Sequence, residues 1–211
     1  MPRTRPERHG ERRRRAILAA ARDVGTAEGL EGLSIGRLAA EVGMSKSGVA
    51  AHFGSKRDLQ LLAVESAAEG YERNVIAPPR EAEPGIARVQ AMMEAWIDYI
   101  EGIEYRGGCF FASAGAEFAA RPGPVRDHVA AHTSTWIRAL EREIRTARRL
   151  AELAPDTDER LLAFQLHALV QEANLRQTLL DDEGAFDDAR ALLAATLADA
   201  APTPPIRGDR P

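Results

Sequence analysis

Cysteine is almost absent from the chain, since Cys109 is the only one in 211 residues. An internal disulfide framework is therefore excluded, and a reducing compartment is favoured. Aromatic residues make up only 5%, and no stretch approaches the roughly 18 consecutive apolar residues of a membrane span. No apolar segment follows the N-terminal arginines, so no secretory signal is expected. The abundant residues, 45% apolar and 28% charged, predict a soluble globular protein of the cell interior with no membrane partner.

Lysine is also scarce, and charge is unevenly distributed. Only Lys46 and Lys56 are lysines among the 28 basic residues. Residues 1–57 contain twelve Lys and Arg against six Asp and Glu, a net charge of +6, whereas the rest carries −10 and brings the chain to −4. A basic segment joined to an acidic remainder indicates that one end of the molecule contacts a polyanion.

Apolar residues recur at helical spacing along most of the chain, and no alternating strand pattern competes with them. Glycines, prolines and N-capping serines divide this pattern into about nine helices. We expect them at residues 11–28, 34–42, 45–51, 55–71, 84–101, 109–120, 125–153, 158–180 and 185–200. The predicted fold class is all-α, between a flexible basic arm at residues 1–10 and a disordered, proline-rich tail at residues 202–211.

Two short predicted helices joined by Val42–Gly43–Met44 have the form of a helix-turn-helix. Glycine permits the tight turn between them. The second helix begins Ser45–Lys46–Ser47–Gly48, and such small polar residues let a helix end approach base edges in the major groove of DNA. The helix capped by Ser55 offers free N–H groups to a phosphate. The pattern therefore predicts DNA binding.

From Ile17 to Leu59 the sequence resembles, without a gap, the TetR family of one-component bacterial repressors. The recurring elements are Glu28–Gly29, the cap Ser34, Leu38–Ala39, Val42–Lys46 and His52–Lys56. The resemblance implies a DNA-binding domain at residues 11–57 and a ligand-binding and dimerisation domain at residues 58–201. It also implies location in the bacterial cytoplasm, at the nucleoid when bound to DNA.

The expected DNA contacts lie in the helix-turn-helix and the basic helix before it. Lys46 and Lys56 are expected to contact phosphates, and Ser45 and Ser47 to lie nearest the bases. The full set is Arg15, Ser34, Ser45, Lys46, Ser47, Gly48, His52, Phe53 and Lys56.

Two positions depart from the family pattern. Gly25 stands where the family often has an aromatic residue, and we expect looser packing of the first helix there. Ala50 stands where the family usually has an aromatic, commonly a tyrosine that touches a phosphate. One phosphate contact is therefore expected to be missing.

The last two predicted helices carry broad apolar faces. The resemblance implies that they pair with a second copy as a four-helix bundle. One helix-turn-helix also covers too little DNA for useful specificity. A homodimer places two recognition helices about 34 to 36 Å apart, which suits a palindromic operator.

Aromatic residues concentrate between residues 96 and 136, where the resemblance implies a cavity for a small apolar or amphipathic effector. The ligand-binding candidates are Trp96, Tyr99, Phe110, Phe111, Phe118, His128, Trp136 and His167, with Ser113, Glu117 and His132 as further polar groups. The function expected is that of a transcriptional repressor that this effector releases from its operator, with the helix from Ser55 to Tyr71 as the lever.

Two alternatives involve Cys109. One keeps DNA binding and makes oxidation of Cys109 the switch, which requires an accessible thiol of lowered pKa. The other is an all-α enzyme with Cys109 as nucleophile and His128 or His132 as base, but no orienting group or oxyanion site is evident. His128 and His132 share a helical face as zinc ligands do, yet the glutamate of metalloproteases is missing between them. We therefore expect no metal, no other cofactor and no enzymatic activity.

Overall fold

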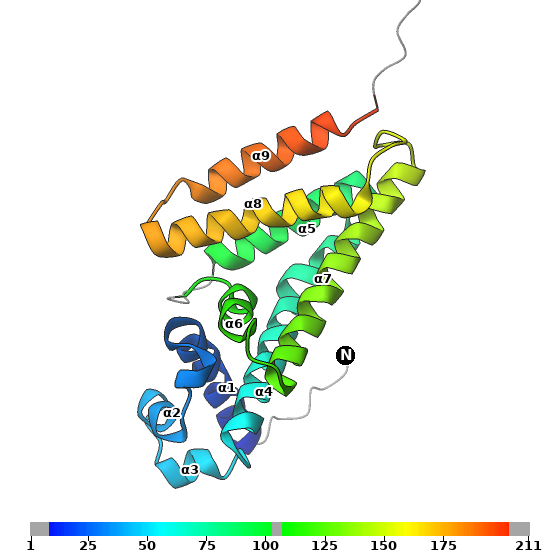
Figure 1. Cartoon of the computed structure of the whole chain (residues 1–211). Helices are drawn as coiled ribbons and strands as arrows, with labels where there is room; N and C mark the ends of the chain where they lie inside the picture. The colour runs from blue at the N-terminus through cyan, green and yellow to red at the C-terminus, as the bar shows by residue number, and fades with distance from the viewer. Residues whose placement is uncertain (1–8, 103–106, 203–211) are drawn as a thin grey trace, which may run out of the picture. The chain divides into compact units, whose positions relative to one another are not determined.

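The computed structural model describes residues 9–102 and 107–202, and every regular element in those residues is helical (Figure 1). The α-helices are α1 (His9–Glu28), α2 (Ile35–Glu41), α3 (Lys46–Ala50), α4 (Lys56–Tyr71), α5 (Ile86–Glu101), α6 (Phe110–Phe118), α7 (Pro124–Arg149), α8 (Glu159–Leu180) and α9 (Ala185–Asp199). Three short elements of other helical types accompany them: η1 (Leu30–Gly32), η2 (Glu72–Ile76) and η3 (Pro78–Glu81). The predicted all-α class is confirmed, with nine α-helices in the described residues.

The helix ends differ from the prediction mainly at two places. α1 begins at His9, inside the expected arm, and residues 1–8 of that arm and 203–211 of the predicted tail lie outside the described residues. α7 ends at Arg149 rather than near Leu153. Ala151 adopts a left-handed backbone (φ 59°), and the N–H of Glu152 donates to the carbonyl of Ala147 at 3.0 Å. This is a Schellman ending formed without the usual glycine, which is why sequence inspection missed it.

The described chain packs as two compact units. The N-terminal unit contains residues 1–72 and 103–133, and the C-terminal unit contains residues 73–102 and 134–211, in both cases as far as they are described. α7 therefore contributes its first turns to one unit and the remainder to the other. No helix in the described part of the chain is long and apolar enough to cross a membrane.

The N-terminal unit has a hydrophobic core that α1, α2, α3 and α4 share with α6 and the start of α7. Its members include Ile17, Ala21, Leu38, Val49, Phe53, Leu59, Val64, Phe110, Phe118 and Val129. Gly25 faces this core, since a methyl group there would lie 3.0 Å from Leu30 Cδ2 and 3.7 Å from Phe110 Cε2. The expectation of looser packing at Gly25 is therefore wrong, because Leu30 and Phe110 fill the space beside it.

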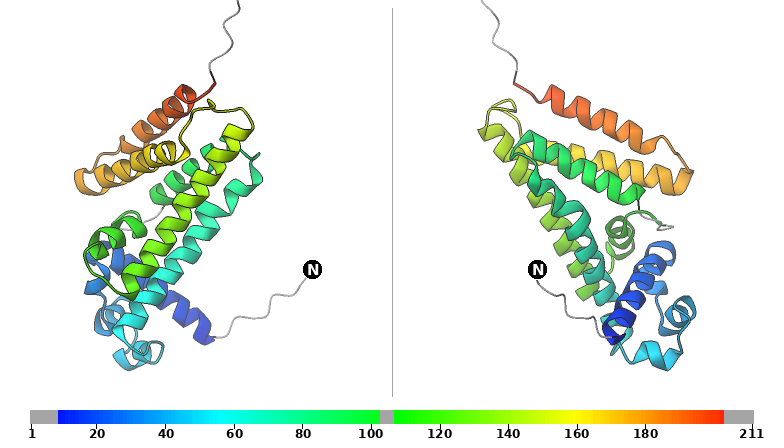
Figure 2. Two further views of the ribbon diagram at one scale, coloured as in Figure 1. Left: turned by 45° about the vertical axis from the view of Figure 1, so that its right-hand side comes forward. Right: turned by 180° about the vertical axis from the view of Figure 1, so that it is seen from behind.

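The C-terminal unit is built from α5, most of α7, α8 and α9. Its largest buried side chains include Trp96, Ile97, Leu140, Ile144 and Phe186. α8 and α9 run side by side (Figure 2). The carboxylate of Glu152 accepts a hydrogen bond from the N–H of Ile86 at 2.8 Å and so satisfies a free donor at the start of α5.

Arg190 on α9 joins that helix to α5 through three carboxylates. Its guanidinium donates to Glu94 at 2.6 Å, to Asp98 at 3.0 Å and to Glu101 at 2.5 Å. The hydrogen bonds to Glu101, first, and to Glu94 raise the pKa of Arg190. Because the three carboxylates repel one another without a cation among them, Arg190 stabilises the packing of α9 on α5.

Replacing Arg190 with glutamine is expected to lower the free energy of unfolding by about 1 kcal/mol, since it removes a partly exposed ion-pair network. For a chain of this size the unfolding temperature should fall by about 2 to 4 °C. Thermal unfolding followed by circular dichroism measures the change, which added salt should reduce by screening. Arg176→Gln is the matched control, because Arg176 pairs with Glu172 on its own helix. Equal losses in the two variants would contradict the special role of Arg190.

Candidate nucleic-acid interface

Three serines begin the helices at the basic end of the chain as N-caps. In each case the Oγ accepts a hydrogen bond from the backbone N–H three residues later at 3.1 Å: Ser34 from Arg37, Ser45 from Gly48 and Ser55 from Asp58. These local hydrogen bonds satisfy donors that a helix start otherwise leaves free. They set the starts of α2, α3 and α4 where the sequence predicted them.

The turn between α2 and α3 depends on Gly43. Its φ of 63° lies in the left-handed region, which glycine adopts without steric cost. The next residue, Met44, donates its N–H to the carbonyl of Ala39 at 3.0 Å. The two helices and this turn form the predicted helix-turn-helix.

α3 is anchored on one side and exposed on the other. Val49 is fully buried, whereas Ser45, Lys46, Ser47 and Ala50 are exposed. The hydroxyls of Ser45 and Ser47 lie 3.2 Å apart. The first turn of α3 therefore presents two hydroxyls and an ammonium group to the outside, on a helix whose back is packed into the core.

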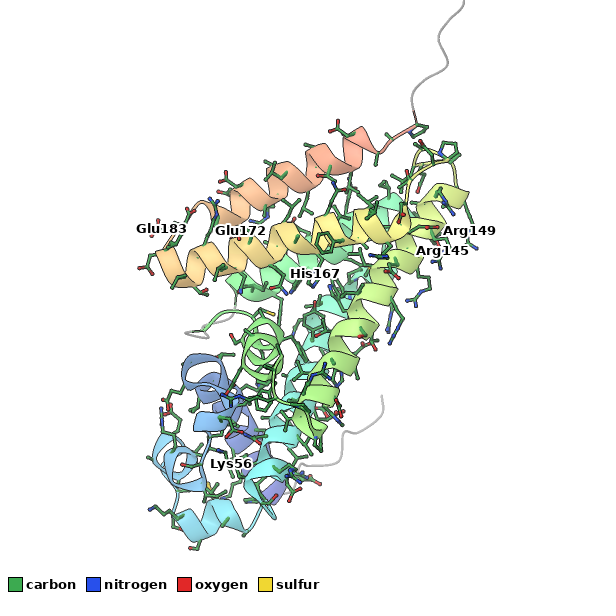
Figure 3. All side chains as sticks on the ribbon, viewed as in Figure 1. Lys56, Arg145, Arg149, His167, Glu172 and Glu183 are labelled. Carbon is green, nitrogen blue, oxygen red and sulfur yellow. The ribbon has the colours of Figure 1, made fainter. Side chains whose placement is uncertain are left out.

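The chain's two lysines differ in their surroundings. Lys46 forms no ion pair with any described residue and is exposed. Lys56, at the start of α4 (Figure 3), donates from Nζ to the carbonyl of Glu31 at 2.6 Å and to its carboxylate at 2.9 Å. The hydrogen bond from Lys56, together with one from Gln60, lowers the pKa of Glu31. Lys46 is thus the freer of the two predicted phosphate contacts.

The remaining residues predicted to contact DNA differ in how deeply they are buried. Arg15 and Ser34 are exposed, and Gly48 and His52 are half-buried. Phe53 has only 8% of its surface exposed and belongs to the core of the N-terminal unit. This apolar ring is buried with the core and anchors the segment after α3, so it does not offer its side chain to DNA; the predicted contact of Phe53 with DNA otherwise stays a prediction.

Arg37 has a structural role that the sequence analysis did not assign. Its guanidinium donates to Glu28 at 2.7 Å and to Glu41 at 2.5 Å, so it ties α2 to the end of α1. The hydrogen bonds to Glu28 and Glu41 raise its pKa. The i,i+4 spacing of Arg37 and Glu41 on one helix could have predicted their ion pair from the sequence. The contact of Arg37 with Glu28 depends on the fold and could not.

Glu117 on α6 is the second residue whose role was missed. Its carboxylate accepts hydrogen bonds from the N–H of Leu30 at 2.7 Å and from the N–H of Glu31 at 2.9 Å. Gly29, just before them, has a φ of 82°, and a methyl group there would lie 3.0 Å from the carboxylate. Glu117 therefore caps η1, and its expected role as a ligand-binding group stays a prediction. Ser113 likewise donates to the carbonyl of Gly107 at 3.0 Å.

Some ligand-binding candidates of the N-terminal unit belong to its buried core, and others lie beside Tyr71 and Glu65. Phe110 and Phe118 are part of the buried core. Phe111 packs edge-on against Tyr71, with ring centroids 5.7 Å apart, and lies 5.7 Å from the ring of His132. The Nε2 atoms of His128 and His132 lie 3.9 and 3.8 Å from one carboxylate oxygen of Glu65. No group of three or more His, Cys, Asp or Glu among the described residues has the geometry of a metal site.

Three of the candidates of the C-terminal unit, Trp96, Trp136 and His167, form one aromatic cluster. Trp96 lies 5.4 Å from Trp136 and 5.0 Å from His167 between ring centroids, and Tyr99 is half-buried on the same helix as Trp96. Burial lowers the pKa of His167, so burial favours the neutral imidazole. Among the described residues, the buried Nε1 of Trp96 has no hydrogen-bond partner.

A cavity of about 320 Å³ opens between α7 and α8 in this unit. It is lined by Ile137, Glu141, Arg160, Leu161, Ala163, Phe164 and His167. Of the predicted ligand-binding residues only His167, labelled on α8 in Figure 3, lines it.

Two sequence models of protein families match the chain. The model described as bacterial regulatory proteins of the tetR family matches residues 17–63. The model described as the tetracyclin repressor-like C-terminal domain matches residues 85–193. No curated protein matches the chain.

Solved structures share the fold over nearly the whole chain. A TetR-family transcriptional regulator from Streptomyces coelicolor is 25% identical, with a TM-score of 0.74 over 89% of this chain and 95% of that one. A TetR transcriptional regulator from Chloroflexus aurantiacus is 23% identical, with a TM-score of 0.82 over 91% and 97%. AibR in complex with isovaleryl coenzyme A and operator DNA is 21% identical, with a TM-score of 0.71 over 87% and 97%.

Replacing Glu117 with alanine is expected to lower the free energy of unfolding by about 1 to 2 kcal/mol, because two backbone N–H groups of η1 lose their acceptor. Urea unfolding measures the loss. Glu117→Gln, which keeps an acceptor oxygen, should recover part of it. Glu69→Ala removes an exposed carboxylate from α4 and is the control; if it costs as much as Glu117→Ala, the capping role is refuted.

Proposed function

Since the chain belongs to the TetR family of bacterial regulatory proteins, we propose that it represses transcription from an operator that α3 reads and that a small-molecule effector makes it release. The observation that carries this is the first turn of α3. Ser45, Lys46 and Ser47 are exposed there, on a helix held by the buried Val49. The protein acts on DNA in the bacterial cytoplasm.

In this proposal residues 11–57 bind DNA and residues 58–201 bind the effector and the second subunit. The small hydroxyls of Ser45 and Ser47 approach base edges, while Lys46, Lys56 and Arg15 contact phosphates. His52, Ser34 and Gly48 complete the contact surface. Ala50 offers no polar group, so direct readout depends on the first turn of α3.

The homodimer is proposed to form through the outer faces of α8 and α9. α8 exposes large apolar side chains, which is unusual for a surface that faces only water: Leu161 (58%), Phe164 (73%), Leu175 (51%) and Leu179 (69%). α9 adds Leu192, exposed by 52%. A second copy would remove these side chains from water and build a four-helix bundle. The pairing also supplies the second recognition helix that a palindromic operator requires.

The effector is proposed to be a small amphipathic molecule bound in the C-terminal unit, in the cavity beside His167. Ile137 and Phe164 give this cavity apolar walls, and Glu141, Arg160 and His167 give it polar groups. The complex of AibR with isovaleryl coenzyme A and operator DNA supports a ligand-responsive regulator of this fold. The effector changes DNA affinity only by its preference for one of two states, typically worth about 1 to 3 kcal/mol.

The two alternatives built on Cys109 are not favoured. Cys109 has 2% of its surface exposed, whereas a redox switch or a nucleophile must be reached by its oxidant or substrate. His128 and His132 have their Nε2 atoms near Glu65. TetR-family regulators are generally not enzymes, and we propose no catalytic activity.

Replacing Lys46 with alanine is expected to weaken DNA binding by about tenfold near 0.1 M salt and to shallow the salt dependence by about one unit, because one phosphate contact is lost. The DNA is an operator selected from random sequences by the purified protein, and fluorescence anisotropy across a salt series gives both quantities. Lys56→Ala should give the same slope change if Lys56 leaves Glu31 for a phosphate.

Arg138→Ala is the matched control, since Arg138 is an exposed cation of the C-terminal unit. It should leave affinity and slope unchanged. A Lys46→Ala variant that also keeps both would remove Lys46 from the interface.

Replacing Leu175 with aspartate is expected to weaken dimerisation by at least about tenfold, since a carboxylate would enter the apolar contact. Sedimentation velocity at micromolar protein concentration should show a shift toward the monomer. Leu150→Asp, at a similarly exposed leucine (55%) outside α8 and α9, should remain dimeric. A Leu175→Asp protein that stays dimeric would place the interface elsewhere.

A further inference from the structure

A second cavity lies within the N-terminal unit, apart from the first turn of α3. It has a volume of about 360 Å³ and is bounded by η1, the start of α4, the end of α6 and the segment that leads into α7. Phe118 and Val125, each 6% exposed, and Gln60, 4% exposed, form its buried floor. Pro122 and Pro124 restrict the backbone at its rim.

The lining of this cavity is strongly basic. Lys56, Arg57, Arg121 and Arg126 contribute four cations, against the single carboxylate of Glu31. A surplus of positive charge around a concave surface attracts anions because the low-dielectric walls strengthen the field. The cavity therefore has the charge of a binding site for a multivalent anion.

Three of the four cations have an acidic partner: Lys56 pairs with Glu31 at 2.9 Å, and Arg121 and Arg126 have the longer contacts given below. Arg57 forms no ion pair with any described residue. Arg126 lies 3.4 Å from its neighbour Asp127. Arg121 lies 3.9 Å from Glu117 and 5.8 Å above the ring of Phe118. At 3.9 Å and with the Arg121 side chain 54% exposed, the pair with Glu117 is a long, solvent-screened contact.

The start of α7 lies at the same cavity. α7 runs for 26 residues from Pro124, and its first-turn residues Val125 and Arg126 line the cavity. The N–H groups of a first turn have no partner within the helix, and the helix dipole favours negative charge there. The arginine side chains and the helix start are independent features that favour the same class of ligand.

We propose that this cavity binds a small multivalent anion bearing phosphate or carboxylate groups. The anion is held by Arg57, Arg121 and Arg126 and competes with Glu31 for the ammonium group of Lys56. Because the proposed function assigns Lys56 to an operator phosphate, occupation of the cavity also lowers DNA affinity. The site is a second point of control, distinct from the cavity beside His167.

Inorganic pyrophosphate is the probe, and isothermal titration calorimetry of the full chain without DNA is the measurement. Sodium chloride keeps the ionic strength constant throughout. We expect saturable binding of one pyrophosphate per chain, weakened at least about tenfold in the Arg121→Gln/Arg126→Gln variant. The Arg138→Gln/Arg142→Gln variant removes two exposed cations from the C-terminal unit and should bind as the unchanged chain does.

Equal affinity in the two double variants would overturn the proposal, as would binding that is not saturable at constant ionic strength. The phosphates of the operator are the other ligand that these arginines could bind. If the Arg121→Gln/Arg126→Gln variant loses DNA affinity while the unchanged chain binds no pyrophosphate, the cluster serves DNA and the proposal fails. Calorimetry needs no operator, so failure of the proposed repressor function leaves this test intact.

Discussion

The carboxylate of Glu117 is the constraint on which the N-terminal unit depends. It accepts the N–H groups of Leu30 and Glu31 across 87 and 86 residues of sequence and so fixes the turn that follows α1. The carbonyl of Leu30 then accepts the side chain of Gln60 at 2.9 Å, and Glu31 holds Lys56. Through these contacts α6, η1 and the start of α4 form one hydrogen-bonded assembly. In the chain, the helix-turn-helix of α2 and α3 lies between η1 and α4, so this assembly holds it on both sides.

The two lysines of the N-terminal unit have different surroundings in the free protein. Lys46 stands exposed at the start of α3, whereas Lys56 is held by Glu31 in the free protein. An ammonium group is a compact charge with three donors, so Lys56 can exchange Glu31 for another anion without a change of fold. In the two proposals, this exchange would occur with a small anion in the basic cavity or with a phosphate of the operator. The proposed DNA binding and the proposed anion binding would therefore depend on the same side chain.

The C-terminal unit combines two proposed surfaces on one helix. α8 buries Leu166 and Val170 against the rest of the unit, and it exposes Leu161 and Phe164, which also line the cavity beside His167. A second copy on this face would therefore lie at the mouth of the effector cavity. Dimerisation and effector binding then share side chains, so that a ligand can favour one arrangement of the dimer over another.

The sequence by itself determined the nine α-helices of the described residues, the serine caps of three of them, the Gly43 turn and the family, because each rests on residues a few positions apart or on an ungapped pattern. Only the tertiary structure decided that Phe53 is buried, that Phe110 fills the space beside Gly25, and that α7 stops before Ala151. It also decided that Glu117 caps η1. The contacts of Phe110 and Glu117 join residues far apart in the chain, and their energy depends on burial and direction, which no local pattern contains. The end of α7 is a local turn, but it forms without the glycine that would have marked it.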